Sequence, residues 1–297
     1  MTDVSVDAPT LSLPEPGPVA ERRHGPSGAA LRVLLYVSLA VVAFAVLLPV
    51  IWMLLSSVKP EHDILAHPAQ LWPTHLTFTN YSEVFKQIPF LRQFGNTVLF
   101  AGAVTLFSLF FDSMTGYALA RLEFPGKRLL FLAVLLFLML PAQVTLVPVY
   151  QLLSHLHLVN TFPGLIIPRA TNAFGIFFMR QFFLGIPNDM SEAARIDGAG
   201  EFRIYSRIVL PLAMPALLTL GLFHLMFNWN DLLWPLVLTT DTAMQTLPAG
   251  LAMFMGQHVV EYGLLMAGAT MAMVPMLLAF VVVQRRFIEG IATTGLK

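Results

Sequence analysis

A charged stretch between two strongly apolar runs is the segment best suited to binding chemistry in this chain. It spans Pro187–Pro215 and contains arginines and acidic residues, which cannot lie in lipid hydrocarbon. We therefore predict a loop in water. Within it, Asp189 can cap a helix, and Glu192 follows three positions later as in a capping box. Gly198 and Gly200 can end that helix.

The predicted loop helix covers two turns, Met190–Asp197. Ala193 and Ala194 are small residues on one side of it, and small side chains let another protein surface approach a helix backbone closely. The pattern favours a docking element. An ordinary connector is the alternative, because a Glu-Ala-Ala triplet also occurs by chance in many helices.

Composition assigns the whole chain to a class. The 297 residues are 57% hydrophobic and 11% charged, and the mean hydropathy is +0.73, far from the values of soluble domains. This is an integral membrane protein. The formal net charge is zero, so there is no overall basic field for nucleic acid, and we expect no nucleic-acid partner. The absence of cysteine excludes disulfides and thiolate metal sites.

Six apolar runs, each long enough to cross a bilayer core, divide the chain. They are Val33–Met53, Thr97–Ala120, Leu129–Tyr150, Pro163–Phe183, Leu212–Leu238 and Gly263–Val283. We predict a disordered cytoplasmic tail at 1–30 without a signal peptide. The first span and an extracytoplasmic loop with short surface helices follow at 31–94. A core domain at 95–290 includes a loop at 187–211, and a C-terminal tail occupies 291–297.

The positions of lysine and arginine orient these spans. Most of the seventeen basic residues lie in the N-terminal tail, the turn at 121–128, the region 180–207 and the C-terminal end. The opposite loops contain only Lys59, Lys86 and Arg92, and Arg169 lies within a span. By the positive-inside rule, both termini and the charged loop are cytoplasmic.

The charged loop resembles a segment of a known family. The residues Glu192-Ala193-Ala194, Asp197-Gly198-Ala199, Ile208, Leu210 and Pro211 are similar to the cytoplasmic EAA loop of permease subunits of bacterial ABC importers. The IDGA run after EAAR resembles the carbohydrate-importing, maltose-type branch. Further similarities follow in other parts of the chain: Tyr117-Ala118-Leu119-Ala120-Arg121, Phe124-Pro125-Gly126, Asn228-Trp229-Asn230-Asp231 and Gln284-Arg285-Arg286-Phe287.

The resemblance implies an all-α integral membrane fold of six transmembrane helices with a cytoplasmic coupling helix, in a bacterial inner membrane. That helix sits in a groove of a separate ATPase subunit, which the acid at Glu192 engages. The implied ATPase-coupling residues are Glu192, Ala193, Ala194, Arg195, Asp197, Gly198 and Gly200. The implied partners are a homologous second permease, two ATP-binding subunits, an extracytoplasmic solute-binding protein, a sugar and membrane lipid. We favour coupling over an ordinary connector because motif and context agree.

No catalytic motif accompanies these features. The Gly126-Lys127 pair lacks the upstream glycine and the following Ser or Thr of a phosphate loop, so the chain is not expected to hydrolyse ATP. No H-E-x-x-H motif is present, and the eight histidines are scattered. We therefore expect no catalytic residue, no cofactor and no metal. The chain is a transport subunit, and the energy comes from a partner.

Polar residues inside the apolar spans are candidates for a solute path. They are Gln143, Asn172, His224 and Asn228, with Trp229 beside them. Polar groups next to aromatic rings suit a sugar, whose hydroxyls need hydrogen bonds. Such residues also bond neighbouring helices or belong to an interfacial aromatic belt, and the two interpretations stay open. Asp112 has no role beyond pairing with another helix or facing a wet cavity.

The expected substrate is an oligosaccharide, a disaccharide or a related polyol, with glycerol-3-phosphate as the alternative in the same branch. A secondary transporter would need ion-coupling carboxylates in its spans, where Asp112 is the only clear one. An intramembrane protease would need a Ser and a His at matching depth, but the Gly25-Pro26-Ser27-Gly28 motif lies in the tail.

Overall fold

The computed structural model describes residues 26–256 and 260–294, which divide into two compact units at 1–51 and 52–297. Most of the predicted N-terminal tail and the last three residues of the predicted C-terminal tail lie outside the described residues. Helix α1 begins at Pro26, within the range predicted for the tail, and α15 continues to Thr294. Both predicted tail boundaries therefore cut into helices.

Within the described residues the secondary structure is helical and contains no strand. The helices before the charged loop are α1 Pro26–Ser57, α2 Glu61–Ala66, α3 Thr79–Gln87, α4 Phe90–Arg121, α5 Lys127–Met139, α6 Ala142–His155, α7 Phe162–Ile166, the 3₁₀ turn η1 Ile167–Arg169 and α8 Ala173–Leu184. The helices from the loop onward are α9 Asp189–Ile196, α10 Glu201–Ile204, the π-helical turn η2 Tyr205–Val209, α11 Leu210–Leu212, α12 Met214–Trp229, α13 Leu233–Leu238, α14 Leu247–Leu251, the 3₁₀ turn η3 Ala252–Phe254 and α15 Tyr262–Thr294. The predicted short surface helices are α2 and α3.

Three helices are long and apolar enough to cross a membrane. They are Ala30–Ser57, Phe90–Arg121 and Tyr262–Val282 within the described residues, and the number is up to five if each of two bent helix pairs is one span. The predicted third span is one of these pairs, because α5 and α6 meet at an angle of 102°. Pro141 follows α5, where it disfavours helical backbone at Leu140, which is extended. The predicted span over Leu129–Tyr150 is therefore sharply bent at Leu140 and is not one straight helix.

The predicted fourth and fifth spans are also interrupted. The segment Pro163–Phe183 comprises α7, η1 and α8, and α8 alone is only about 18 Å long, shorter than a bilayer core. In the segment Leu212–Leu238, α12 ends at Trp229 and α13 starts at Leu233. The second bent pair, 201–212 and 214–229, turns by 79°. Uniform hydropathy conceals these breaks, because an apolar residue gives the same signal in a bent segment as in a straight one.

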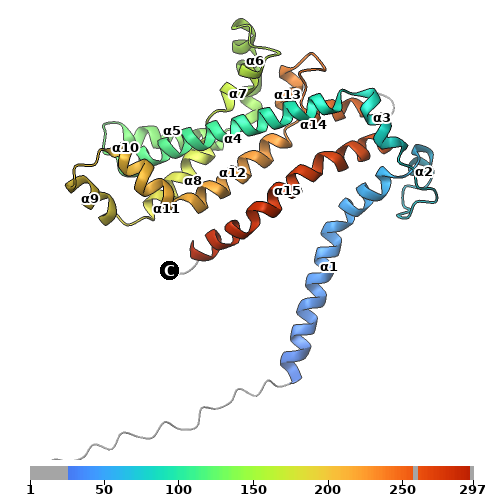
Figure 1. Ribbon diagram of the computed structural model, residues 1–297, viewed down its shortest axis with the longest axis horizontal. Coiled ribbons are helices and arrows are strands. Elements are labelled where there is room, and N and C mark those ends of the chain that lie inside the picture. The colour runs from blue at the N-terminus through green and yellow to red at the C-terminus, as the bar shows by residue number, and fades with distance from the viewer. Residues whose placement is uncertain (1–25, 257–259, 295–297) are drawn as a thin grey trace, which may run out of the picture. The chain divides into compact units, whose positions relative to one another are not determined.

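Five helices of the second unit, α4, α5, α8, α12 and α15, pack against one another (Figure 1). Helix α4 contacts α8 and α12, while α5 packs on α8 and α15 packs on α12. The largest buried cluster joins α4 and α8 to the loop and the start of α12. It consists of Tyr117, Met179, Phe183, Ile204, Tyr205, Val209, Ala213, Ala216 and Leu220. Buried side chains of the loop therefore pack directly against those of the long helices.

The α3 end of the second unit is tied together by polar contacts. Asn96 of α4 donates to the carbonyls of Ala243 and Gln245, at 2.8 and 2.9 Å. The carboxylate of Glu61 accepts hydrogen bonds from the first amides of α15, those of Tyr262 and Gly263, at 3.0 and 2.6 Å. An acid at a helix N-terminus satisfies free N–H groups and interacts favourably with the helix dipole. These contacts hold α4 to the segment before α14 and hold α2 to the start of α15.

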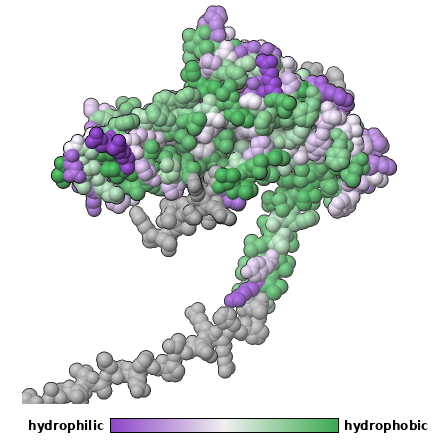
Figure 2. Space-filling view, viewed as in Figure 1, coloured by the Kyte–Doolittle hydropathy of each residue, from purple (hydrophilic) through white to green (hydrophobic). Residues whose placement is uncertain are grey.

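The surface of the second unit separates by polarity (Figure 2). Hydrophilic side chains gather over α9 and α10 at one end, over α2 and α3 at the other and along the edge formed by α6 and α13, and hydrophobic side chains cover most of the remaining surface. Many large apolar side chains there are exposed, including Leu106, Leu129 and Leu278. Exposed apolar surface of this extent is typical of contact with lipid or with another membrane subunit.

Candidate coupling loop and intramembrane polar cluster

The charged loop folds as the predicted short helix, with one correction. Helix α9 begins at Asp189, and Asn188 takes the N-cap position. Asp189 is therefore the first helical residue and does not cap the helix, although its charge still lies in the first turn near the positive end of the dipole. The helix ends before Asp197, and Gly198 adopts φ +78°, a left-handed conformation that favours glycine.

One face of α9 is fully open. Glu192 and Ala193 are exposed, and the side chain of Glu192 makes no hydrogen bond or ion pair among the residues that the structure describes. Met190 is 51% exposed and Ile196 is 87% exposed on the same short helix. These two residues are not among the predicted contacts, although apolar side chains in an otherwise charged loop are a usable signal. Apolar groups around a free carboxylate are what a docking surface requires.

On its other side, the loop is joined to α4 through Glu201. Glu201 forms an ion pair with Arg195, with 2.6 Å between Oε1 and Nε, and accepts a hydrogen bond of 2.8 Å from the Tyr117 hydroxyl of α4. The hydrogen bond from Arg195 holds the pKa of Glu201 below its ordinary value. Arg195, one of the predicted coupling residues, therefore braces the loop against the helix core. Gly200 begins α10 as its N-cap.

The second half of the loop is anchored in the core. Ile204 and Tyr205 are buried and Ile208 is partly buried, whereas Phe202 is 67% exposed and faces away from the core. The Tyr205 hydroxyl bonds the Ser113 hydroxyl of α4 at 2.8 Å. These contacts give the loop the stiff connection to α4 that transmission of movement needs.

A cluster of polar side chains lies among the apolar helices, with Asp112 of α4 at its centre. Asp112 is fully buried. It accepts hydrogen bonds from the hydroxyl of Thr171 at 2.7 Å and from the backbone N–H of Asn172 at 2.9 Å. Its second oxygen lies 3.1 Å from Nε2 of His224 on α12. Of the two roles considered for Asp112, pairing with neighbouring segments describes its position.

Gly175 in the first turn of α8 makes this approach possible. A Cβ atom at position 175 would lie 1.9 Å from Oδ2 of Asp112 and 3.0 Å from Nε2 of His224. No side chain larger than hydrogen fits there without moving the carboxylate. Asn172 caps the same helix, because its side-chain oxygen accepts the N–H of Phe174 at 2.8 Å. Asp112 and Asn172 thus hold the start of α8 against α4 and α12.

A second group of polar side chains extends from this cluster. Asn228 donates to the carbonyl of His224 at 2.7 Å and lies 3.4 Å from Nη1 of Arg169. Arg169 forms a 2.6 Å ion pair with Asp231, and its guanidinium lies 5.1 Å from the ring centroid of Trp234. The pair connects η1 to the break between α12 and α13. The sequence analysis did not pair Asp231 with Arg169, because the two residues are far apart in the chain.

The structure brings together three of the five predicted path residues. Asn172, His224 and Asn228 belong to the cluster around Asp112, and His224 and Asn228 are buried. Gln143 is exposed in the first turn of α6 and makes no hydrogen bond within the described part of the chain. Trp229 faces the other side of α12, where its indole N–H donates to the carbonyl of Ala272 on α15 at 3.1 Å.

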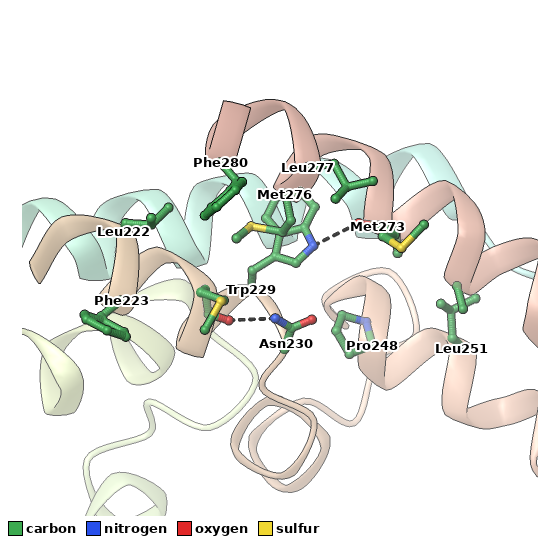
Figure 3. A pocket seen from close by; sticks show the side chains of 13 residues that line it. Leu222, Phe223, Trp229, Asn230, Pro248, Leu251, Met273, Met276, Leu277 and Phe280 are labelled. Carbon is green, nitrogen blue, oxygen red and sulfur yellow. Dashed lines mark hydrogen bonds between the residues drawn. The ribbon is translucent and has the colours of Figure 1, made fainter. Parts of the chain in front are cut away.

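Trp229 lines a cavity of about 590 Å³ between α12, α14 and α15 (Figure 3). Its walls are mostly apolar and rich in methionine, with Met226, Met273 and Met276 among them. Asn230 supplies a polar group, and its amide nitrogen donates to the carbonyl of Met226 at 2.8 Å. A cavity of this size with aromatic walls and few polar groups is typical of small-molecule sites. Asn230 was not among the predicted path residues.

Comparisons with known proteins agree with these features. Residues 112–292 match the family described as binding-protein-dependent transport system inner membrane component, and the chain belongs to this family. It is a permease subunit of an ATP-driven ABC importer, and ATP hydrolysis belongs to separate subunits. It is therefore a multi-pass membrane protein and not an enzyme.

Individual relatives are similar along most of the chain. An arabinooligosaccharide transport system permease protein of Halalkalibacterium halodurans is 37% identical, covering 89% of this chain and 96% of the relative. A diacetylchitobiose uptake system permease protein of Streptomyces coelicolor is 36% identical over 84% of this chain and 83% of its own. A solved bacterial ABC transporter that imports the acidic polysaccharide alginate has a TM-score of 0.76 at 24% identity, covering 89% of this chain and 99% of that one. This last similarity shows the fold.

Proposed function

We propose that this permease imports a sugar, most plausibly an oligosaccharide or a disaccharide. The proposal is supported by the relatives whose names specify arabinooligosaccharides, diacetylchitobiose and trehalose. Glycerol-3-phosphate is not favoured by these names. The apolar and aromatic wall of the α12–α15 cavity also suits the CH faces of a sugar ring better than a doubly charged phosphate ester.

The proposed coupling element is α9. Its open face carries Glu192 and Ala193, whereas Ala194 packs partly against the buried cluster, and Asp197 and Gly198 terminate the helix. The single observation that carries this assignment is the combination of a free carboxylate at Glu192 with the unpartnered Ile196, on a helix whose other side is fixed by Arg195 and Glu201. A groove of an ATP-binding subunit would cover the open face. Movement of that groove would pass through Tyr117 and Tyr205 to α4.

The proposed assembly pairs this chain with a homologous second permease, two ATP-binding subunits and an extracytoplasmic solute-binding protein. In this arrangement the loop at 187–211 and both termini face the cytoplasm, in agreement with the distribution of basic residues. The domain layout proposed from the sequence places the core domain at 95–290, and both of its limits lie within helices, α4 and α15. Apolar surface between the two polar ends leaves room for a second membrane subunit.

The proposed solute path follows the α12 face that carries Trp229 and Asn230. Nε2 of His224 is already hydrogen-bonded to the Asp112 carboxylate, and Asn228 is bonded to a backbone carbonyl and to Arg169. These groups are therefore proposed to form the wall behind the path, together with Asn172. Gln143, exposed on α6, is proposed as a further contact where that helix begins.

The coupling assignment is tested by replacing Glu192 and measuring uptake. In Glu192→Ala, we expect uptake of a labelled oligosaccharide, assayed in the intact importer, to fall by at least about tenfold, as for the loss of a charged docking contact. Membrane abundance should not change, because the side chain makes no contact within the described chain. Glu83→Ala is the matched control, since Glu83 is a surface acid on α3 that pairs with Lys86 at 2.7 Å. Normal uptake at normal abundance in Glu192→Ala would contradict the assignment.

A further inference from the structure

A second cavity lies at the α9 end of the second unit, between the α4–α5 turn, the start of α5 and α8. Its volume is about 640 Å³. Glu123, Lys127, Arg128 and Arg180 contribute charged side chains, and Phe131 forms an aromatic wall. None of these residues belongs to the coupling face of α9 or to the polar cluster around Asp112. The cavity therefore has no role in the functions described above.

Positive charge at this cavity exceeds what the described chain neutralises. Glu123 pairs with Lys127 at 3.1 Å, which leaves Arg128 and Arg180 without an acidic partner among the described residues. Helix α5 begins here after Gly126, which has φ +83° and provides no side-chain cap, and the first turn contains no acid. Free N–H groups and the dipole make the start of a helix electropositive, so Lys127 and Arg128 oppose the dipole. An anion in the cavity would relieve this repulsion.

Arg180 is held in a fixed orientation toward the cavity. Its guanidinium carbon lies 3.8 Å from the ring centroid of Phe131, and its Nε donates to the carbonyl of Leu119 at 3.2 Å. The terminal guanidinium nitrogens make no hydrogen bond with the described residues. Two parallel N–H groups on a restrained planar guanidinium are suited to bind a phosphate group bidentately.

The surface next to the cavity is apolar. Helix α5 continues from Arg128 as an almost uninterrupted apolar run to Met139, and Leu129, Leu132 and Leu136 are exposed along it. A ligand with a charged group in the cavity would thus have hydrocarbon-compatible surface directly beside it. Free phosphate would use only the charged part of this site, whereas a phospholipid would use both parts.

We propose that this cavity binds the phosphate headgroup of an anionic phospholipid whose acyl chains lie along α5. Basic pockets between transmembrane helices on the cytoplasmic side are suited to such headgroups. Lys127, Arg128 and Arg180 supply the positive charge around the phosphate. Glu123 opposes binding by its negative charge. The inference does not depend on the sugar substrate or on the coupling face of α9.

The test is the amount of lipid retained by the full-length chain in native mass spectrometry, after equilibration with phosphatidylglycerol or phosphatidylcholine. We expect wild type to retain phosphatidylglycerol preferentially. In the Lys127→Gln/Arg128→Gln variant, apparent affinity for phosphatidylglycerol should fall on the order of tenfold. In Glu123→Gln, the apparent affinity for phosphatidylglycerol should rise severalfold. Because Glu123 is exposed, misfolding of this variant would not explain such a change.

A matched charge change at the other end provides the control. Lys86→Gln/Arg92→Gln removes two exposed basic side chains near α3 and should leave lipid retention unchanged. An equal loss in this variant, or no preference for phosphatidylglycerol in wild type, would overturn the proposal. Competition with soluble anions separates a lipid site from a simple anion site. If inorganic phosphate displaces phosphatidylglycerol as effectively as soluble glycerophosphoglycerol does, and phosphatidylglycerol binds no more tightly than glycerophosphoglycerol, the acyl chains add nothing to affinity. The site then binds free anions, and the lipid proposal is wrong.

Discussion

The α9 loop and the cluster around Asp112 are both polar parts of an apolar protein, but they are built in different ways. The α9 loop is continuous in sequence, its functional face is open, and its glycine and acids are spaced as a short helix requires. The Asp112 cluster joins residues of α4, of the segment before α8 and of α12; Asp112 and His224 at its centre are buried, and Thr171 and Asn172 lie at its exposed edge. The loop is suited to binding a partner, and the cluster is suited to fixing helices relative to one another.

This difference determines where each region tolerates change. At the α9 loop an exposed residue can be replaced with little effect on the fold, because its interactions would form with another subunit. In the cluster the polar groups are bonded to one another within the protein, and Asp112 and His224 are buried, so a replacement of Asp112 leaves donors without their acceptor in a largely apolar surrounding. Variants in the cluster should therefore lower stability, and variants on α9 should lower activity.

The largest expected effect follows from removal of the Asp112 carboxylate. Asp112→Ala leaves the hydroxyl of Thr171, the N–H of Asn172 and His224 without their acceptor, at a cost of about 3 kcal/mol in the free energy of unfolding. Denaturant unfolding in mixed micelles would measure this loss. Asp241→Ala is the control, because Asp241 is exposed and accepts the N–H of Ala243 near the protein surface. Equal losses in the two variants would show that the cluster does not hold the helices together.

The two regions also differ in how far sequence alone predicts them. The α9 helix and its glycine terminus were predicted because capping and left-handed backbone depend on residues a few positions apart. Asp112 was recognised as unusual, but its partners were not, because Thr171 and His224 are distant in sequence and only packing brings them together. The breaks near Pro141 and after Trp229 were missed for a related reason: hydropathy measures burial in lipid and not helix direction.

The next effect in size concerns the close approach at Gly175. Gly175→Ala would place a methyl group 1.9 Å from the Asp112 carboxylate, which is fixed by its three hydrogen bonds, and should destabilise the protein by about 2 kcal/mol. The same unfolding assay measures it. Gly102→Ala on α4 is the matched control, since no atom lies within 4 Å of the added methyl group. Because alanine is the better helix former, that variant should be neutral or slightly stabilising. If Gly175→Ala leaves the stability unchanged, the Asp112 carboxylate can move aside at little cost in free energy.

The smallest expected effect would show whether the loop and the core work as one unit. Tyr117→Phe removes the hydroxyl that joins α4 to Glu201, and Tyr81→Phe removes a matched hydroxyl that bonds Ser57 at 2.8 Å near the opposite end. Each variant should lose about 1 kcal/mol of stability, because each loses one hydrogen bond. Only Tyr117→Phe should lower the amount of solute transported per ATP, since Glu201 remains paired with Arg195 but its bond to the moving helix is lost. Parallel uptake and ATPase measurements in reconstituted vesicles would show this difference. If both variants transport as wild type does, contacts such as that between Tyr205 and Ser113 are sufficient for coupling, and the Glu201 bond only stabilises the fold.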